Sequence, residues 1–247
     1  MEMDRRSPRR AAGTLEVNGL SRPKAWISWS TGKDSAWALH TVRERGDVEV
    51  VALLTTVNTA HARVAMHAVR ESLLEAQSEA LGLPLVKVPI PSPCPNAVYE
   101  QAMAEAIGRA RQEGITHMVF GDLFLEDIRK YREEKLASTG ITPLFPIWGL
   151  DTLGLAREMV AAGLRALITC VDPKKLERAF AGRTFDAELL GQLPGGVDPC
   201  GENGEFHTYA FEGPMFQKPI AVEVGEIVER DGFVFADVVP SVTGAPS

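Results

Sequence analysis

The 247-residue sequence has few cysteines and no long apolar stretch. Its three cysteines, Cys94, Cys170 and Cys200, are far apart and odd in number. This spacing argues against a disulfide framework and against a Cys-x-x-Cys zinc site. No run approaches the roughly 20 apolar residues that a membrane helix needs, and no secretory hydrophobic segment follows the start. We therefore expect a cytoplasmic protein without a membrane segment.

The sequence also lacks the positive charge of a general nucleic-acid-binding protein. Its formal net charge is −7, with 33 acidic and 26 basic residues, whereas contacts to a phosphate backbone need clustered lysine and arginine. The one basic cluster is Arg5, Arg6, Arg9 and Arg10. It falls within residues 1–23, which show no periodicity and which we interpret as a disordered tail.

Short apolar runs alternate with helical patterns over the first half of the chain. We predict strands at 25–30, 48–57, 85–90 and 115–120. Helices are expected between them at 35–45, at 65–81, and from a cap at Asn96 to Gly114. This alternation is typical of an α/β protein with a doubly wound parallel sheet.

Beyond residue 126 the pattern changes to a mixture of short helices and strands. Asp151 is expected to cap a helix that ends at Gly163, and Asp231-Gly232 to form a hairpin turn. We therefore divide the chain into a tail, a nucleotide-binding domain and a second, smaller α+β domain, at 1–23, 24–126 and 127–240.

One polar hexapeptide, Ser30-Thr-Gly-Lys-Asp-Ser35, lies between a buried strand and a helix. Gly32 permits the close approach of an anion, and the N–H groups and dipole of the helix start favour phosphate. The hydroxyls of Ser30 and Ser35 and the charge of Lys33 add donors, and a carboxylate such as Asp34 is a suitable Mg²⁺ ligand. The hexapeptide is not a Walker A loop, because that motif needs a glycine where this chain has Ile27.

Two further segments fall at carboxyl ends of predicted strands, where ligands bind in parallel sheets. They are 55–58 and Gly121-Asp122. The residues from Ser30 to Ser35 share this position, so we expect all three segments to face one crevice.

The hexapeptide resembles the Ser-Gly-Gly-x-Asp-Ser loop of the PP-loop ATP pyrophosphatases, or adenine nucleotide alpha hydrolases. Enzymes with this loop bind the pyrophosphate group of ATP and release AMP or an adenylated substrate. Thr31 stands where that family has its first glycine, and its β-carbon narrows the approach to the phosphate.

Three longer segments resemble the diphthine–ammonia ligase family, and the likeness extends from about Trp26 to Phe216. They are Gly121-Asp-Leu-Phe-Leu-Glu-Asp-Ile-Arg129, Pro143-Leu-Phe-Pro-Ile-Trp148 and Cys200-Gly-Glu-Asn-Gly-Glu-Phe-His-Thr208. The resemblance implies a nucleotide domain of the HUP type followed by a smaller carboxyl-terminal domain. It also implies a ligase that adenylates a carboxylate on a modified histidine of a translation elongation factor and then aminates it with ammonia.

The resemblance implies ATP and Mg²⁺ as ligands, with ammonium and a carboxylate acceptor as partners, and a homo-oligomer is compatible with it. Lys33 and Asp34 are the expected catalytic residues, and Asp34 and Asp122 the expected metal ligands. The expected ATP-binding residues are Ser30, Thr31, Gly32, Lys33, Asp34, Ser35, Thr55, Gly121 and Asp122. The expected substrate residues are Cys200, Glu202, Asn203, Glu205 and His207.

Several of these residues have a second interpretation. The side chains at 200–207 are also suited to binding zinc or to capping backbone N–H groups. Asp122 also suits a helix start, and Arg129 either stabilises phosphate charge or has no role in the site. His67 and Arg70 share a helix face that is turned either to the nucleotide or to solvent.

Two other functions stay open at this point. One is a sensor of the same fold that binds ATP or AMP without turnover. The other is a PP-loop RNA-modifying enzyme, although thiolases of that kind commonly use paired cysteines and a basic face, which this sequence lacks.

Overall fold

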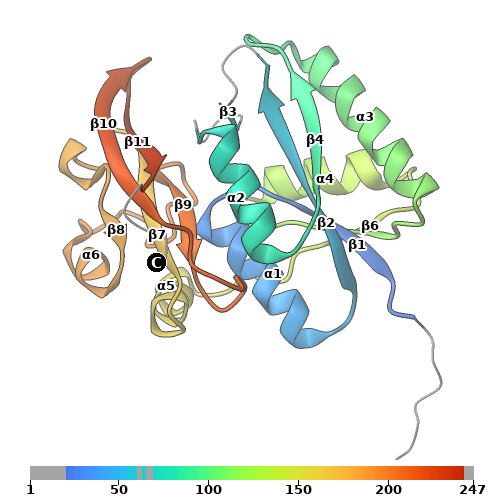
Figure 1. Cartoon of the computed structure of the whole chain (residues 1–247), viewed down its shortest axis with the longest axis horizontal. Helices are drawn as coiled ribbons and strands as arrows, with labels where there is room; N and C mark the ends of the chain where they lie inside the picture. Colours follow the sequence, from blue (N-terminus) through green and yellow to red (C-terminus); the bar gives the residue numbers. More distant parts are fainter. Residues whose placement is uncertain (1–20, 60–62, 65–68, 242–247) are drawn as a thin grey trace, which may run out of the picture.

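The structure is a computed structural model of the chain, and it describes residues 21–59, 63–64 and 69–241. Two β-sheets lie side by side, each with its own helices (Figure 1). Residues 1–20 of the predicted tail lie outside the described residues, and so does His67. Within the described part, no helix has the length and apolar character needed to cross a bilayer.

The first sheet contains, among the described residues, five parallel strands in the order β4-β2-β1-β5-β6. They are β1 (Lys24–Ser28), β2 (Glu49–Asn58), β4 (Leu85–Ile90), β5 (His117–Val119) and β6 (Thr142–Leu144), with a short β3 (Arg63–Val64) antiparallel to the end of β2. The accompanying helices are α1 (Lys33–Arg45), α2 (Glu71–Leu81), α3 (Asn96–Gln112) and α4 (Glu126–Leu136). The predicted parallel α/β sheet is confirmed.

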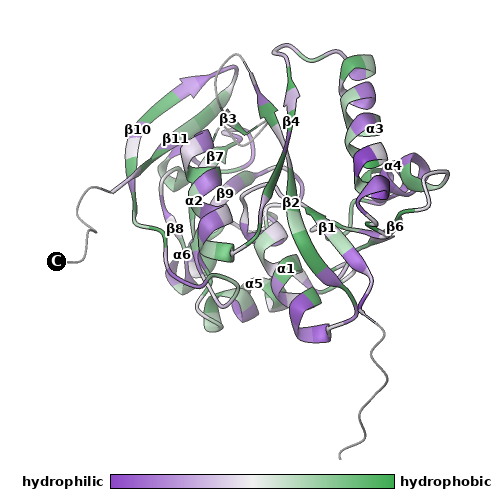
Figure 2. Cartoon of the chain, turned by 45° about the vertical axis from the view of Figure 1, so that its right-hand side comes forward, coloured by the Kyte–Doolittle hydropathy of each residue, from purple (hydrophilic) through white to green (hydrophobic). Residues whose placement is uncertain are grey.

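Helices cover both faces of this sheet, because side chains alternate along each strand. Ile27 of β1 packs with α1, α2 and the second sheet, whereas Trp26 packs on the opposite face with Ile107 of α3 and Leu136 of α4. Figure 2 shows hydrophobic strands at the centre of the molecule and hydrophilic stretches on the outer helices. Trp26 and Trp29 are buried.

The second sheet is antiparallel throughout, with β10-β11-β7-β8 in order and β9 also paired to β7. Its elements are α5 (Thr152–Ala161), β7 (Arg165–Val171), η1 (Arg178–Phe180), β8 (Thr184–Phe185), α6 (Ala187–Gln192), β9 (Phe206–Glu212), β10 (Val222–Arg230) and β11 (Phe233–Pro240). The smaller α+β region is therefore confirmed. Its hairpin turns at Asp231 and Gly232, whose φ angles of 54° and 81° suit the predicted tight turn.

Several predicted boundaries differ from the structure. The strand β6 pairs with β5, so the parallel sheet extends beyond residue 126, and we propose that the boundary lies between Leu144 and Asp151. Asp151 caps α5 as expected, accepting from the Gly154 N–H at 2.7 Å. Asn96 is not a cap, because Pro95 holds that position and Asn96 is the first helical residue.

Gln77 of α2 joins the two sheets from a fully buried position. Its Nε2 donates to the carbonyl oxygens of Thr31 at 2.9 Å and Ala210 at 2.7 Å. Its Oε1 accepts from Nε1 of Trp29 at 2.8 Å. One amide thus ties a helix of the first sheet to the end of β1 and to β9 of the second sheet.

We predict that Gln77→Leu lowers the free energy of unfolding by about 2–4 kcal/mol, because it leaves a buried indole N–H and two carbonyl groups without this partner. Urea unfolding followed by circular dichroism measures the change. A loss below about 0.5 kcal/mol would show that this junction contributes little to stability.

Candidate functional site

The segment from Ser30 to Ser35 leaves the end of β1 and forms the first turn of α1. The hydroxyl of Ser35 donates to the Gly32 carbonyl at 3.0 Å and lies 3.1 Å from the hydroxyl of Ser30. Because α1 begins at Lys33, the N–H groups of its first turn have no acceptor within the helix. The loop therefore presents hydroxyl and amide groups at the positive end of a helix dipole.

Thr31 has a φ of 72°, a left-handed conformation that a β-branched residue rarely adopts. Its carbonyl oxygen accepts from Gln77, and also from the N–H of Ala210 at 2.9 Å. Its hydroxyl is buried and has no hydrogen-bond partner among the described residues. The glycine of the PP-loop pattern therefore corresponds to a position with glycine geometry, which this chain holds by contacts from α2 and β9.

The second sheet completes the loop through β9. The N–H of Lys33 donates to Oγ1 of Thr208 at 3.1 Å. A β-carbon at Gly32 would lie 3.2 Å from the Thr208 carbonyl oxygen, so β9 passes directly over the glycine. The loop is thus enclosed between α1 and β9.

Gly121, at the end of β5, lies against the start of α1. A β-carbon there would lie 2.9 Å from the carbonyl carbon and oxygen of Asp34 and from the nitrogen of Ser35. These are backbone atoms, which cannot move aside as a flexible side chain can. Gly121 therefore permits β5 to approach the loop.

Lys33 is buried between the two sheets, with its side chain 2% exposed. Its Nζ lies 2.9 Å from both carboxylate oxygens of Asp34, and it donates to the carbonyl oxygen of Cys200. It also lies over the rings of Phe185 and Phe206. Burial acts to lower the pKa of Lys33, but Asp34 opposes it and the pKa is raised, so Lys33 is charged at neutral pH.

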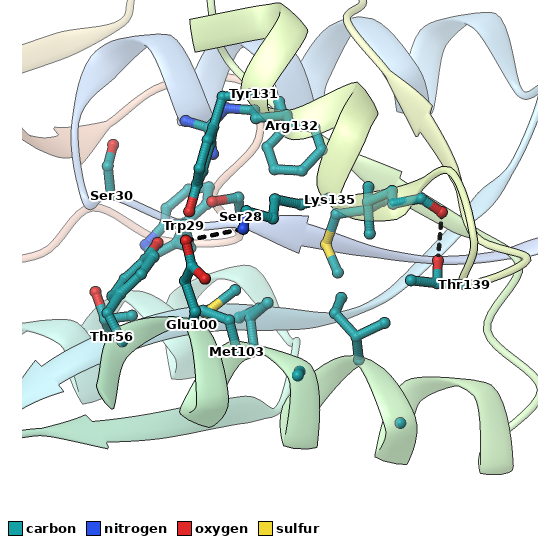
Figure 3. A pocket seen from close by; sticks show the side chains of 18 of the residues that line it. Ser28, Trp29, Ser30, Thr56, Glu100, Met103, Tyr131, Arg132, Lys135 and Thr139 are labelled. Atoms are coloured by element: carbon teal, nitrogen blue, oxygen red, sulfur yellow. Dashed lines mark hydrogen bonds and ion pairs between the residues drawn. The ribbon is translucent and has the colours of Figure 1, made fainter. Parts of the chain in front are cut away.

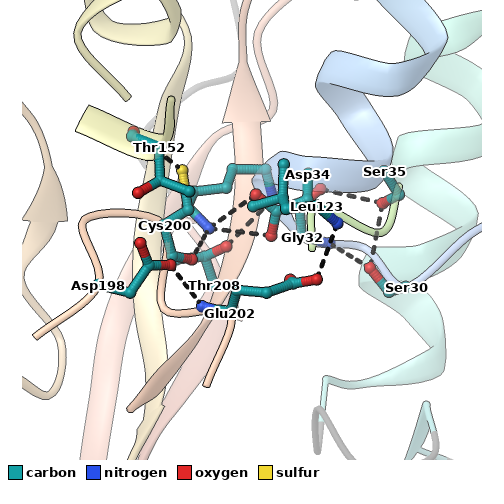
Figure 4. A network of polar contacts seen from close by, with 11 residues as sticks. Ser30, Gly32, Asp34, Ser35, Leu123, Thr152, Asp198, Cys200, Glu202 and Thr208 are labelled. Atoms are coloured by element: carbon teal, nitrogen blue, oxygen red, sulfur yellow. Dashed lines mark hydrogen bonds and ion pairs between the residues drawn. The ribbon is translucent and has the colours of Figure 1, made fainter. Parts of the chain in front are cut away.

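Glu202 adds a carboxylate to the same region (Figure 4). It accepts from the N–H of Leu123 at 2.8 Å, and its own N–H donates to Asp198 at 2.8 Å. Burial raises the pKa of Glu202 to about 7, and the nearby Asp34 and Asp122 carboxylates contribute to this rise. The hydrogen bond from the Leu123 N–H acts in the opposite direction. This carboxyl group is therefore able to hold or release a proton near neutral pH.

Asp122 pairs with Arg132 of α4. Nε of Arg132 lies 2.6 Å from Oδ2, and one terminal nitrogen donates to Oδ1 at 3.0 Å. The guanidinium group also lies over the ring of Phe120, 4.4 Å from its centroid. These contacts fix the orientation of Arg132.

Two cavities meet beside the loop. The smaller, which we call the crevice, has a volume of about 230 Å³. Its polar lining comes from the loop, from the end of β5 and from the second sheet, and includes Ser30, Gly32, Lys33, Asp34, Ser35, Gly121, Asp122, Arg132, Glu202, His207 and Thr208.

The larger cavity, of about 560 Å³, lies between α3 and α4 on one face of the first sheet (Figure 3). Apolar side chains such as Met103, Met118 and Phe120 line most of it. Glu100 of α3 and Lys135 of α4 meet at 2.8 Å within its lining. This volume is typical of a site for a small organic molecule.

Most of the predicted nucleotide residues line the crevice, but Thr31 and Thr55 do not. Thr55 is buried and donates to the carbonyl oxygen of Trp29 at 2.9 Å. The neighbouring Thr56 lines the large cavity instead, because successive side chains of a strand point to opposite faces.

The predicted substrate residues divide in the same way. Glu202 and His207 line the crevice, whereas Cys200, Asn203 and Glu205 do not. Oε1 of Glu205 accepts from the N–H of Asp198 and from Asn203, as expected for a carboxylate that caps backbone groups. The thiol of Cys200 is directed to the carbonyl oxygen of Thr152.

Burial raises the pKa of Cys200 to about 12, so its thiol is not a nucleophile. Burial and the nearby Lys33 lower the pKa of His207, so its imidazole is neutral at pH 7.

Arginines that the sequence singled out lie elsewhere. Arg129 lies over the rings of Phe145 and Trp148 and pairs with Glu133 at 2.8 Å. Arg70 precedes α2 and pairs with Asp237 of β11.

Among the residues that the structure describes, the arginine that lines the crevice is Arg132, which the sequence pattern did not single out. It lies one turn beyond Arg129 on the same face of α4, so the two differ in their position along the helix axis, which the helical pattern alone does not place against the crevice.

The residues present fit a magnesium ion bound together with phosphates. Mg²⁺ usually takes one or two carboxylates and fills its other positions with water and phosphate oxygens. Asp34 and Asp122 line the same crevice, and their side chains are 27% and 13% exposed. Within the described ranges, no three His, Cys, Asp or Glu side chains gather into a protein-only metal site.

We predict that Gly121→Ala costs about 1–3 kcal/mol of stability, because its β-carbon would overlap backbone atoms of the loop. Gly108→Ala in α3 is the matched control. A β-carbon there meets nothing within 4 Å, and alanine favours a helix by about 0.8–1.0 kcal/mol over glycine. Urea unfolding of both variants measures the difference, and equal stabilities would contradict the close packing at Gly121.

A second prediction concerns pH. Because the folded-state pKa of Glu202 lies above its ordinary value, the folded protein binds this proton more tightly than the unfolded chain does. Stability is then lost as pH rises from about 5 to 7. Glu202→Gln keeps the acceptor for the Leu123 N–H and removes the charge. Its free energy of unfolding should therefore exceed that of the wild type by about 1–2 kcal/mol at pH 8 and equal it at pH 5. Thermal unfolding across this range measures the gap, and parallel pH profiles would contradict the assignment.

Comparisons with known proteins agree with this two-part architecture. The family model described as diphthamide synthase N-terminal domain matches residues 23–142, and the one described as diphthamide synthase C-terminal domain matches residues 151–238. The diphthine–ammonia ligase of Danio rerio is 27% identical over 238 residues, which covers 85% of this chain and 90% of that protein.

Two mammalian proteins with the same name match a shorter part. The diphthine–ammonia ligases of Homo sapiens and Rattus norvegicus are each 32% identical, over 126 and 120 residues. Each alignment covers 46% of this chain and 45% of the relative, so less than half of these two relatives is matched. The two domain models together extend from residue 23 to residue 238, and the chain therefore belongs to the diphthine–ammonia ligase family.

Proposed function

We propose that this protein is an ATP-dependent ligase that activates a carboxylate as its adenylate, releases pyrophosphate, and joins the acyl group to ammonia with release of AMP. The observation that supports this most is the loop at the start of α1, whose hydroxyl and amide groups line a polar crevice beside an apolar cavity. Relatives named diphthine–ammonia ligase support the same reaction, with diphthine as the acceptor.

The two cavities suit the two halves of ATP. The phosphates would lie in the crevice, where the hydroxyls of Ser30 and Ser35 and the N–H groups of α1 that follow Lys33 would donate hydrogen bonds, since the N–H of Lys33 is already bound to Thr208. The nucleoside would lie in the large cavity, where Tyr99 and Phe120 offer aromatic surface. The acceptor would then enter from the side of the second sheet, close to Glu202.

Asp34 and Asp122 would hold Mg²⁺, which neutralises phosphate charge when it is bound. Lys33 would have two roles at this site. Its ammonium group is already held by Asp34 and by the Cys200 carbonyl, so it orients the Asp34 carboxylate. Its positive charge also favours a polyphosphate in the adjoining crevice.

In the first step a carboxylate oxygen of the acceptor attacks the α-phosphorus. The bond to the bridging oxygen breaks, and pyrophosphate leaves with the electron pair. The loop residues stabilise the charge that builds on this leaving group.

In the second step an ammonium ion gives a proton to the Glu202 carboxylate, and the nitrogen of the resulting ammonia attacks the acyl carbon. AMP leaves with the electron pair of the broken carbon–oxygen bond, and the amide nitrogen releases a further proton to solvent. Glu202 suits this task because burial brings its pKa to about 7.

The products of ATP turnover test the proposal. The protein with Mg²⁺, ATP, ammonium and candidate carboxylates, diphthine included, should form AMP and pyrophosphate in an acceptor-dependent way. Ser35→Ala should lower the rate by at least about tenfold through the lost phosphate contact. Cys94→Ser, whose side chain lies outside both cavities, serves as the control and should leave the rate unchanged.

Formation of ADP and phosphate would overturn the proposal. Saturable ATP binding with no AMP under any acceptor would favour the nucleotide sensor instead.

A further inference from the structure

The two cavities share four lining residues, which are Ser28, Ser30, Arg132 and His207. The polar crevice lies on one side of these residues and the apolar cavity on the other. ATP has the same division, and its α-phosphate is the group that connects the nucleoside to the pyrophosphate. A nucleotide that fills both cavities therefore places its α-phosphate at this junction.

Arg132 is the permanent cation at the junction. Ser28 and Ser30 contribute hydroxyl groups, and the imidazole of His207 is neutral at pH 7 because burial and Lys33 lower its pKa. A guanidinium group stays charged at every physiological pH, and its planar set of N–H donors matches the oxygens of a phosphate.

Arg132 is also held ready for an anion. One terminal nitrogen donates to Oδ1 of Asp122, Nε lies 2.6 Å from Oδ2 as an ion-pair contact, and the guanidinium group lies over the ring of Phe120. Five N–H groups are available on an arginine, so the pair with Asp122 leaves donors on the other edge of the group. The side chain is 28% exposed, which leaves it accessible to a ligand in the cavities.

We propose that Arg132 binds the α-phosphate of ATP and that Asp122 positions it, an inference that rests on the function proposed above. When the acceptor oxygen attacks the α-phosphorus and pyrophosphate leaves, negative charge builds on the non-bridging oxygens of that phosphate. Arg132 donates hydrogen bonds to these oxygens without transferring a proton. Its orientation is fixed before the reaction, so little reorganisation is needed.

Binding of separate pieces of the nucleotide tests this assignment by calorimetry. Arg132→Ala should weaken AMP binding by about ten- to a hundredfold, the value of a charge-assisted hydrogen bond. Adenosine and magnesium pyrophosphate, which lack the α-phosphate, should bind within about twofold of the wild type. Arg132→Lys should fall between the two for AMP, because it keeps the charge but loses the planar set of donors.

Arg129→Ala is the matched control. Arg129 is on the same helix, one turn earlier, and lies over Phe145 and Trp148 outside both cavities. It should leave the binding of adenosine and AMP unchanged. Asp122→Asn should weaken the binding of AMP but not that of adenosine. The effect should be smaller than that of Arg132→Ala, since Asp122→Asn removes the positioning ion pair and keeps the guanidinium group.

The outcomes separate this inference from the proposed function. Suppose that the wild type binds ATP and AMP. If Arg132→Ala then binds AMP as tightly as the wild type, or if its affinity for adenosine falls as much as its affinity for AMP, the assignment of Arg132 is wrong and the proposed function stands. If the wild type binds neither nucleotide, both are overturned. Should Arg132→Ala prove unfolded by thermal melting, the AMP-to-adenosine ratio of Arg132→Lys decides, and an unchanged ratio overturns the inference.

Discussion

The candidate site depends on the contact between the phosphate loop and strand β9 of the second sheet. Thr208 accepts from the N–H of Lys33, and the N–H of Ala210 donates to Thr31. The carbonyl of Cys200, in the turn before β9, holds the ammonium group of Lys33. A left-handed threonine costs about 1–3 kcal/mol, so the loop needs these partners to keep its shape. The loop therefore reaches this geometry only when both sheets are folded and in contact.

The same contact sets the charge of the crevice. Three different parts of the chain bring together the carboxylates of Asp34, Asp122 and Glu202. Lys33 forms an ion pair with Asp34, and Arg132 forms one with Asp122. Removing carboxylates from water is costly unless each has a partner. Burial raises the pKa of Glu202, whose partner is a backbone N–H, to about 7, and burial also raises the pKa of Asp34 in spite of its pair with Lys33. One proton near neutrality is thus exchangeable beside a site suited to phosphate.

Local sequence patterns predicted the elements well and the site residues only in part. Short apolar runs between helical patterns, and a polar loop after the first strand, were sufficient for the parallel sheet and for the phosphate loop, because both are short-range features. The strand β6 (Thr142–Leu144) was missed, since a strand of three residues is too short to show periodicity. Thr55 was expected to contact the nucleotide, but its neighbour Thr56 is the one that lines the large cavity. A shift of one residue along a strand moves a side chain to the opposite face of the sheet.

Local patterns were sufficient for the parallel strands β1, β2, β4 and β5, for the loop from Ser30 to Ser35 and for the family, because each of these resides in neighbouring residues or in motifs along the chain. Three features depend on packing between distant segments: Lys33 faces Asp34 and the turn before β9, Glu205 caps a turn, and Arg132 rather than Arg129 lies between the cavities. These outcomes depend on which face of each element meets a partner far away in sequence. Local propensity does not encode such long-range packing.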